Sequence, residues 1–251
     1  MEAFIDPSAR IGEGTNIGRF SVVEKDAVIG RNCQIGHGVV IHAGARIGDE
    51  VRIDDHAVVG KQPMRAANSI LKDRPPAPPP AVADRVLIGT GVVLYAGCTI
   101  APRVLIADLA TVREDVTIGE GTIVGRGVTV ENQCTIGRFC KLETESYITA
   151  YSSLGDRVFV APGVLTSNDN FVGRTDERFK HYKGVTVEKG GRLGVGSVIL
   201  PGITIGADTL IAAGSVVTEN APARQIVLGT PAKAWRPVPK EQLLENQGWK
   251  E

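Results

Sequence analysis

The chain has 251 residues, of which 28 are basic and 28 are acidic, so its formal net charge is zero. Balanced charge without long Lys/Arg runs argues against a nucleic-acid footprint and against a membrane-surface helix. No apolar stretch approaches the roughly 18 residues of a membrane span, and residues 1–11 lack the basic segment and apolar core of a secretion signal. We therefore expect a cytoplasmic protein that binds neither nucleic acid nor membrane.

A branched aliphatic residue returns at every sixth position from Ile5 to Val59, and the period resumes from Ile88 to Thr166 and from Leu193 to Val217. The fourth residue after each aliphatic is Ser, Thr, Ala, Val or Cys, with Ile203 as the exception. One large and one small inward position in six residues fit a parallel β-helix with three short strands per coil, for which the hexapeptide repeat is the sequence signature. The repeats predict about nine to ten coils.

The period is interrupted at residues 60–87 and 167–192, which predicts two loops that leave the prism. We expect one main domain at residues 1–221, because stacked coils contact only their neighbours and can extend this far as one unit. Residues 222–251 contain several prolines and end in the helix-compatible run Lys240–Asn246. They are predicted to form a capping tail with a short C-terminal helix.

Small residues in the repeat have two predicted roles. Glycine often follows the aliphatic residue, as at Gly12 and Gly119, where the backbone must turn or approach a neighbouring coil closely. Cysteine is interpreted as a packing residue, rather than a metal ligand or a disulfide partner, because buried cysteine behaves as a small hydrophobe. The cysteines all occupy the small inward position: Cys33, Cys98, Cys134 and Cys140.

The hexads, together with the late segments Ala213–Thr218 and Gly229–Lys233, resemble the hexapeptide-repeat acyltransferases over nearly the whole chain. Ala107–Glu114 and Ser167–Phe171 are similar to segments of the nucleotide-sugar N-acyltransferases that act on amino-dideoxy sugars. The resemblance implies an all-β, left-handed parallel β-helix that works as a homotrimer, with acyl-CoA in the cleft between prisms. It further implies transfer of an acetyl or short hydroxyacyl group from acyl-CoA to the amine of a dTDP- or UDP-linked amino sugar, without a metal.

Acyl transfer to an amine requires a neutral amine in line with the thioester carbonyl and a route for the amine proton. The resemblance implies that acidic residues hold the amine, here Asp108 and Glu131, and that the CoA sulfur accepts the proton. For Asp108, a surface ion pair with Arg126 in the next coil is the alternative interpretation. His181 in the second loop is a candidate general base, unless it is simply solvated.

Further polar residues are candidate substrate ligands. Glu114, Asn132 and Asn168 are separated by multiples of 18 residues, which predicts a polar stripe on one outer face. Asn168, Asp169 and Asn170 begin the second loop, where they either bind sugar hydroxyls or the pantetheine arm, or cap turns of the backbone.

Basic residues of the first loop suit a diphosphate, since Lys and Arg donate charge-assisted hydrogen bonds to phosphate oxygens. The alternative interpretation is that this loop projects into solvent and binds no phosphate. The residues concerned precede a proline run: Lys61, Arg65, Lys72 and Arg74.

Near the last coils, the resemblance implies contacts with CoA. Basic residues there suit its phosphates, and glycines let the acyl carrier approach the backbone closely. The candidates are Lys189, Lys233 and Arg236 for the phosphates, and Gly194, Gly196 and Gly214 for the approach.

Three other functions remain as alternatives. His37 and His42 have the H-x4-H spacing of the γ-class carbonic anhydrases. The third zinc ligand of that class would lie two coils before His37, where this chain has Met1, and His56 follows His37 by one coil plus one residue. The zinc ligand set is therefore incomplete. Acyl-ACP-dependent acylation, as in lipid A synthesis, is the closest enzymatic alternative, and a non-catalytic scaffold is the other.

Overall fold

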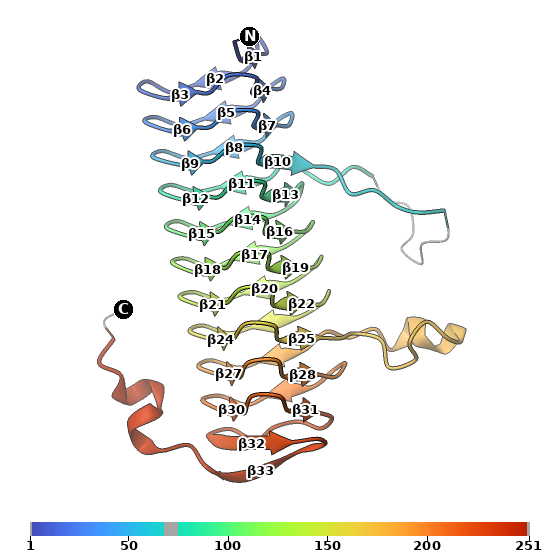
Figure 1. The fold of residues 1–251 in the computed structure, drawn as a ribbon. Coiled ribbons are helices and arrows are strands. Elements are labelled where there is room, and N and C mark those ends of the chain that lie inside the picture. The colour runs from blue at the N-terminus through green and yellow to red at the C-terminus, as the bar shows by residue number, and fades with distance from the viewer. Residues whose placement is uncertain (1, 68–74, 250–251) are drawn as a thin grey trace.

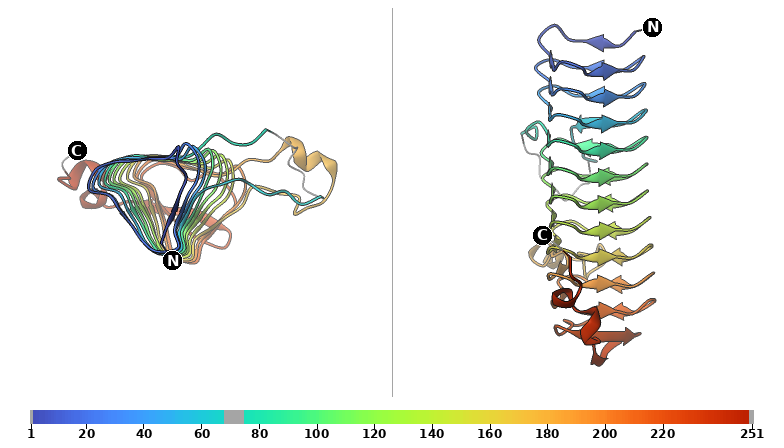
Figure 2. Two further views of the ribbon diagram at one scale, coloured as in Figure 1. Left: turned by 90° about the horizontal axis from the view of Figure 1, so that it is seen from above. Right: turned by 90° about the vertical axis from the view of Figure 1, so that its left-hand side faces the viewer.

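The computed structural model describes residues 2–67 and 75–249 and folds them into a three-sided prism of parallel strands. Figure 1 shows the turns stacked along one axis from β1 to β33. Seen from its N-terminal end in Figure 2, the chain turns counterclockwise as it recedes, which is a left-handed coil. Each turn passes through faces A, B and C in that order, and we name the corners A–B, B–C and C–A after the faces that they join.

Each face is a ladder of very short strands. Face A consists of β1 (Phe4–Ile5), β4 (Val22–Val23), β7 (Val40–Ile41), β10 (Val58–Lys61), β13 (Val93–Tyr95), β16 (Thr111–Val112), β19 (Thr129–Val130), β22 (Tyr147–Ile148), β25 (Leu165–Thr166), β28 (Val198–Ile199) and β31 (Val216–Val217). Face B consists of β2 (Arg10–Ile11), β5 (Val28–Ile29), β8 (Arg46–Ile47), β11 (Ala81–Val82), β14 (Thr99–Ile100), β17 (Thr117–Ile118), β20 (Thr135–Ile136), β23 (Ser153–Leu154), β26 (Thr186–Val187) and β29 (Thr204–Ile205). Face C consists of β3 (Asn16–Ile17), β6 (Gln34–Ile35), β9 (Arg52–Ile53), β12 (Leu87–Ile88), β15 (Leu105–Ile106), β18 (Ile123–Val124), β21 (Lys141–Leu142), β24 (Phe159–Val160), β27 (Arg192–Leu193), β30 (Leu210–Ile211), β32 (Gln225–Gly229) and β33 (Ala232–Pro237).

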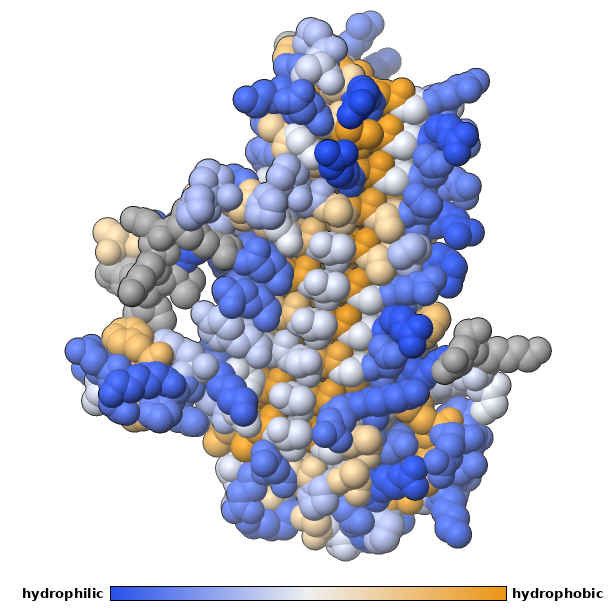
Figure 3. All heavy atoms as spheres, turned by 180° about the vertical axis from the view of Figure 1, so that it is seen from behind, coloured by the Kyte–Doolittle hydropathy of each residue, from blue (hydrophilic) through white to orange (hydrophobic). Residues whose placement is uncertain are grey.

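The core is a set of aliphatic columns. Ile118 lies in register between Ile100 and Ile136 on the neighbouring strands, and all three are at most 1% exposed. Burying such a side chain stabilises the fold by about 1.5–3 kcal/mol. The outward residues of the same strands are small, and in Figure 3 face B carries a narrow stripe of weakly polar residues between hydrophilic corners.

The prism is longer than predicted, with 11, 10 and 12 strands on faces A, B and C in the described residues. Val82 and Val187 lie six residues before Ile88 and Leu193, so the period continues inside both predicted interruptions. After Val217 the hexad phase is lost, yet β32 still pairs in parallel with β30. The division of the chain into domains at residue 221 stays a prediction.

The glycine that follows the inward aliphatic is required by close packing of the backbone. An ideal Cβ on Gly119 would lie 2.5 Å from the carbonyl carbon and oxygen of Gly137 in the next turn. Gly163 differs, because it has a φ of +66° and no atom within 4 Å of an added Cβ. Crowding by the backbone of the next turn therefore requires glycine at position 119, and the left-handed backbone conformation favours glycine at position 163.

Replacing Gly119 with alanine should lower the free energy of unfolding by about 2–3 kcal/mol, because two backbone segments must move apart. Gly163→Ala is the matched control and should cost only about 1 kcal/mol, the strain of a left-handed conformation without a clash. Urea unfolding of both variants measures the difference. Equal losses would show that crowding between turns is not what requires glycine after the aliphatic residue.

The four cysteines are buried free thiols, and Cys134 Sγ donates a hydrogen bond to the carbonyl oxygen of Thr149 at 3.1 Å. Burial raises the pKa of Cys98 and Cys134 to about 12 and that of Cys140 to about 11. These values keep the side chains as neutral thiols, in agreement with the predicted packing role.

These shifts predict a loss of stability at alkaline pH. Thiols of the unfolded chain ionise near pH 9.0, whereas those of the folded chain keep their protons to about pH 11–12. The folded state thus binds more protons in this window, and the free energy of unfolding should fall as the pH rises above 9. Thiol titration at pH 8 should detect reactive cysteine only after unfolding; rapid labelling of the native protein would contradict the assignment.

Two arms leave the prism at the same corner, A–B, and project to the same side (Figures 1 and 2). The first lies between β10 and β11, and the second, between β25 and β26, contains the 3₁₀ helix η1 (Asp176–Lys180). In the first arm, the side-chain amide of Gln62 exchanges two hydrogen bonds with the backbone of Ala77, at 2.9 and 3.0 Å. The outgoing and returning segments of that arm are thereby joined near its base.

The C-terminal tail folds back along the prism. Strand β33 pairs antiparallel with β32, and the predicted helix over 240–246 is instead two 3₁₀ helices, η2 (Lys240–Gln242) and η3 (Leu244–Asn246). The run is broken at Leu243, which is extended and buried in a small cluster with Ile226 and Val238. In the described residues, no helix has the length and apolar character needed to cross a membrane.

Candidate active site

The A–B corner between the two arms carries a column of polar residues, one from each consecutive turn. Lys61 ends β10 and is the register partner of Tyr95 in β13. Arg113 follows β16, and Glu131 follows β19, whose strands continue the same ladder. The column exists because these residues occupy equivalent positions in successive turns.

Arg113 is the centre of this cluster. Its Nε donates to Glu114 Oε2 at 2.9 Å, and its Nη1 lies 3.3 Å from Glu131 Oε2. The guanidinium also lies 4.8 Å from the centre of the Tyr95 ring, over which Lys61 Nζ lies at 5.5 Å. One arginine thus links two carboxylates and an aromatic ring, which restricts the conformations of all three.

The two carboxylates differ in accessibility. The side chain of Glu114 is 1% exposed, whereas that of Glu131 is 22% exposed. Glu131 also accepts a hydrogen bond from the Tyr147 hydroxyl, which in turn interacts with Thr149. Of the two carboxylates that pair with Arg113, Glu131 is therefore the one that a ligand can reach.

The electrostatics of the cluster keep Arg113 protonated. Burial alone would lower the pKa of Arg113, but hydrogen bonds and charge from Glu114, with the charge of Glu131, raise it. Burial raises the pKa of Tyr147, and the negative charge of Glu131 raises it further. Tyr147 thus stays a neutral hydrogen-bond donor that stabilises the Glu131 carboxylate.

The predicted polar stripe is only partly accessible. Asn132 follows Glu131 at the same corner and is 6% exposed, so it is buried together with Glu114. Asn168 lies at the base of the second arm, where its carbonyl oxygen accepts a hydrogen bond from the Lys183 N–H at 3.3 Å. Asn170, two residues further along the arm, is exposed.

Asp169 organises the second arm. Its carboxylate accepts backbone N–H bonds from Phe171 and Gly173, at 2.8 and 2.9 Å. Arg178 Nη1 lies 3.4 Å from the same carboxylate. The bond from Gly173 is the largest cause that lowers the pKa of Asp169, so turn capping accounts for this residue.

His181 directly follows η1, on the projecting arm rather than at the corner (Figure 1). Its Nε2 lies 3.1 Å from Glu177 Oε1, and its side chain is 54% exposed. Its ring centre is 5.8 Å from that of Phe171. Within one chain the structure does not bring His181 to Glu131.

Asp108 lies at the C–A corner, not at the A–B corner with Glu131. Its Oδ1 accepts the backbone N–H of Thr90 at 2.9 Å, and its side chain lines a shallow depression on face C with Arg52 and Asp54. The predicted neighbour Arg126 instead pairs with Glu145, at 3.2 Å. The two proposed amine ligands are thus separated within one chain.

The residues predicted to contact CoA do not gather in one place. Lys189 lies at the B–C corner, Gly194, Gly196 and Gly214 lie at the C–A corner below Asp108, and the other two lie on β33. An added Cβ on Gly196 or Gly214 meets nothing within 4 Å. Their positive φ values, +65° and +67°, explain these two glycines without a ligand. On β33, Lys233 pairs with Glu219 and Arg236 stacks on Trp235.

Of the basic residues predicted in the first arm, Lys61 belongs to the A–B cluster and Arg65 is half-buried on the arm. Lys72 and Arg74 lie outside the described residues, as does Met1 of the alternative zinc site. His37 Nδ1 accepts the backbone N–H of Arg19 at the C–A corner, while His42 lies 3.2 Å from Glu24 at the A–B corner. Across residues 2–67 and 75–249, no three His, Cys, Asp or Glu side chains form a metal-ligand group.

Sequence models of the hexapeptide repeat match the chain in several stretches. The model of the bacterial transferase hexapeptide (six repeats) matches residues 8–43, 26–61 and 97–132, and the model of the hexapeptide repeat of succinyl-transferase matches residues 184–219. The matched residues make up half of the chain. The chain belongs to the hexapeptide-repeat acyltransferases.

Individual relatives within the curated acyltransferases match shorter stretches. A galactoside O-acetyltransferase of Lactococcus lactis is 32% identical over 88 residues, which cover 34% of this chain and 42% of the relative. A 2,3,4,5-tetrahydropyridine-2,6-dicarboxylate N-acetyltransferase of Clostridium perfringens is 50% identical over 46 residues, covering 18% of this chain and 20% of the relative. This chain thus spans less than half the length of these curated relatives.

Among solved acyltransferase structures, the UDP-N-acetylglucosamine acyltransferase of Arabidopsis superposes with a TM-score of 0.60 over 98% of this chain and 76% of that chain. The two sequences are 16% identical, so the likeness concerns the fold.

Sequence reasoning missed Tyr95, Arg113 and Tyr147 as members of this cluster. A usable signal was present, because Tyr95, Arg113 and Glu131 follow one another at the 18-residue spacing of one coil. Writing the sequence in rows of 18 would have placed them in one column. The contact between Arg113 and its chain neighbour Glu114 depends on rotamers, which the repeat does not encode.

Proposed function

We propose that this acyltransferase moves an acetyl or short hydroxyacyl group from acyl-CoA to the amine of a nucleotide-linked amino-deoxy sugar, at the A–B corner. The observation that carries the proposal is the partly exposed Glu131 carboxylate, held between Arg113 and Tyr147 at the base of the two arms. A carboxylate in this position can accept a hydrogen bond from an amine N–H and leave the nitrogen lone pair directed at a thioester.

The proposed reaction is direct. The neutral amine attacks the thioester carbonyl, the tetrahedral intermediate collapses with loss of the CoA thiolate, and the thiolate takes the amine proton. Glu131 contributes by orienting the amine, which lowers the entropic part of the barrier. His181 is not required as a base in this scheme, which agrees with its place on the arm beside Glu177.

Two further observations support an amine on a sugar as the acceptor. The segments Ala107–Glu114 and Ser167–Phe171 resemble those of nucleotide-sugar N-acyltransferases, and the first contains Arg113 and Glu114 of the cluster. Among the relatives, one is an N-acetyltransferase and another is an O-acetyltransferase of a galactoside, so each shares one part of the proposed acceptor, the amine or the sugar.

Asp108 enters the proposal through assembly. It lies at the C–A corner and cannot share an amine with Glu131 of the same chain. A homotrimer, which the resemblance implies, would set the corner of one prism beside that of its neighbour. In that arrangement Asp108 and the glycines below it would line the same cleft as the Glu131 of another copy.

The test is release of free CoA thiol from acetyl-CoA and short 3-hydroxyacyl-CoAs, measured with a panel of dTDP- and UDP-amino sugars, with and without a chelator. Thiol release that requires the amino sugar and is unchanged by the chelator is the expected result. Activity only with acyl-ACP donors would favour the lipid A type of reaction, and activity lost with the chelator would contradict the metal-free scheme.

A further inference from the structure

The first arm begins at an irregularity in the ladder of face A. Strand β10 pairs in register with β13 until the register shifts, so that Lys61 rather than Gly60 is the partner of Tyr95. Gly60 accommodates the extra residue with a φ of +97°. A β-bulge of this kind changes the direction of a side chain, and bulges are frequent beside active sites. Here the bulge directs the first side chain of the arm at the A–B cluster.

Two cations share the ring of Tyr95. Lys61 lies on the turn before this tyrosine, and Arg113 lies on the turn after it. The Lys61 Nζ is 5.5 Å and the Arg113 guanidinium carbon 4.8 Å from the ring centre, and both distances are within the range of a cation–π contact. The tyrosine is half-buried, and partial removal of water strengthens such contacts. The ring therefore holds both side chains, one from each neighbouring turn.

Arg113 connects this ring to the carboxylate at which the amine is proposed to bind. Its Nε and Nη2 donate to Glu114 at 2.9 and 3.3 Å, and its Nη1 lies 3.3 Å from Glu131 Oε2. Hydrogen bonds to a carboxylate restrain a guanidinium within its plane, and contact with an aromatic face restrains it out of the plane. Loss of the ring would let the group tilt about its bonds to Glu114 and would redirect its bond to Glu131.

We propose that Tyr95 is a positioning residue for Glu131, and that Lys61 holds the ring of Tyr95 against the Arg113 guanidinium. The inference rests on the proposed function for the reaction that Glu131 serves. Tyr95 and Lys61 contact neither the amine nor the thioester in this scheme. Both act through Arg113, which sets the direction of the Glu131 carboxylate and of the amine bound to it. A displacement of about 1 Å in such a group can reduce the rate about a hundredfold.

Steady-state kinetics of thiol release separates positioning from substrate binding. Tyr95→Leu removes the ring and should lower kcat about tenfold, while KM for the amino sugar changes by less than about twofold. Tyr95→Phe keeps the ring face and should rescue kcat. Lys61→Gln should also lower kcat, but it should have no further effect in the Tyr95→Leu background, because it acts through the ring. A rise in KM on Lys61→Gln in both backgrounds would instead make Lys61 a substrate ligand and contradict its positioning role.

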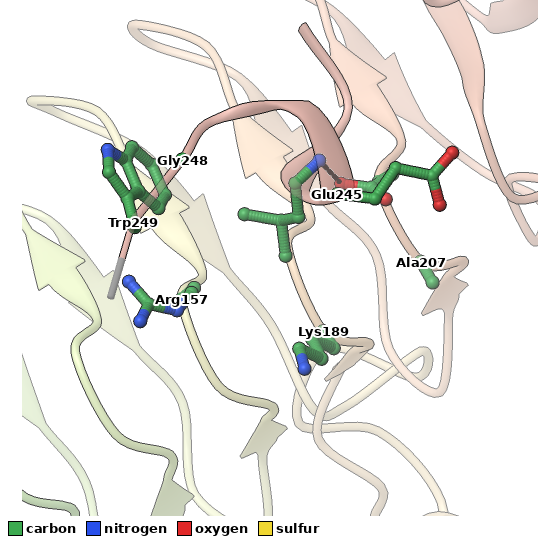
Figure 4. Close-up of a pocket in the computed structure, with 8 residues that line it drawn as sticks. Arg157, Lys189, Ala207, Glu245, Gly248 and Trp249 are labelled. Atoms are coloured by element: carbon green, nitrogen blue, oxygen red, sulfur yellow. Dashed lines mark hydrogen bonds between the residues drawn. The ribbon is translucent and has the colours of Figure 1, made fainter. Parts of the chain in front are cut away.

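Phe139→Leu is the matched control. The half-buried ring of Phe139 also contacts an arginine, Arg157, at 4.9 Å, but this pair lies at the B–C corner, away from Glu131. Figure 4 shows Arg157 at that corner, beside Trp249 of the tail. Phe139→Leu should therefore leave kcat and KM unchanged. Urea unfolding of this variant and of Tyr95→Leu shows whether a loss of stability alone slows the reaction.

A second readout does not require turnover. The Nε–H of Arg113 donates to Glu114, and the guanidinium lies against the Tyr95 ring, so the NMR signal of this N–H should be shifted by the ring and protected from exchange with water. The signal is assigned by its loss in Arg113→Lys. It should move and exchange faster in Tyr95→Leu, and it should keep its position in Tyr95→Phe.

An unchanged kcat in Tyr95→Leu, or a rise in KM alone, would overturn the proposal, as would an unchanged Arg113 signal in that variant. If the wild type transfers no acyl group but Tyr95→Leu releases the Arg113 signal, the proposed function fails and the holding of Arg113 by the ring stands. If the wild type is active and neither kcat nor the signal responds to Tyr95→Leu, only this inference is refuted.

Discussion

Replacing Glu131 by glutamine should lower kcat for amide formation by about 10²–10³-fold and change KM for the amino sugar little. Glutamine keeps the volume of the side chain, but its neutral amide is a weaker acceptor for an amine N–H than a carboxylate is. Its NH₂ group would also face either the Arg113 guanidinium or the Tyr147 hydroxyl, which now hydrogen-bond to the carboxylate. Steady-state kinetics of thiol release measures both constants.

Glu120→Gln is the matched control for this variant. Glu120 is also a glutamate paired with an arginine, Arg103, but it lies at the B–C corner, outside the proposed cleft. It should retain wild-type kinetics, and His181→Ala should retain most of its activity if the CoA sulfur takes the proton. Near-wild-type turnover of Glu131→Gln would remove Glu131 from the reaction, and a loss beyond about a hundredfold in His181→Ala would restore histidine as the base.

Replacing Arg113 by alanine should reduce the free energy of unfolding by about 3–5 kcal/mol, because it removes a cation from a buried carboxylate. Glu114 is 1% exposed and receives two hydrogen bonds from this guanidinium, at 2.9 and 3.3 Å. The substitution also removes the contact with the Tyr95 ring. Urea unfolding at neutral pH measures the loss.

Arg126→Ala is the control for Arg113→Ala, since its ion pair with Glu145 is exposed and should contribute less than about 1 kcal/mol. Arg113→Lys should be intermediate, because an ammonium keeps the charge but cannot bridge two carboxylates as a planar guanidinium does. If Arg113→Ala and Arg126→Ala were equally stable, the buried pair would not organise the A–B corner as described.

The fold could be predicted from the sequence because its period is imposed by packing. Every strand must place a large and a small side chain inward, so the spacing of the aliphatic residues and of small residues such as cysteine indicates directly where each strand lies. The predicted number of turns was too small because a proline run before Val82 and the glycine pair after Val187 conceal two strands that remain in phase, and because β32 and β33 extend face C beyond the last hexad. The tail was assigned one helix because composition cannot show that Leu243 turns inward to a small cluster.

The candidate site could be predicted in part. Glu114 and Asn132 do lie at one corner, with Asn168 at the base of the second arm of the same corner, as their spacing indicated. Asp108, which was predicted to hold the amine together with Glu131, lies at a different corner, and its carboxylate accepts the backbone N–H of Thr90, which gives it a local role. Contacts made by rotamers, such as Arg113 with Glu114, and contacts between copies of the chain are not encoded in the repeat.

The central claim is tested most directly by the product of a reaction between acetyl-CoA and a nucleotide-linked amino sugar. Mass spectrometry should show the sugar with one added acetyl group, and the product should survive treatment with neutral hydroxylamine, since amides resist this reagent and esters do not. Its yield should fall strongly in Glu131→Gln and stay unchanged in Glu120→Gln. A hydroxylamine-labile ester, or no acylated sugar with any acceptor in the panel, would contradict an amine acyltransferase centred on Glu131.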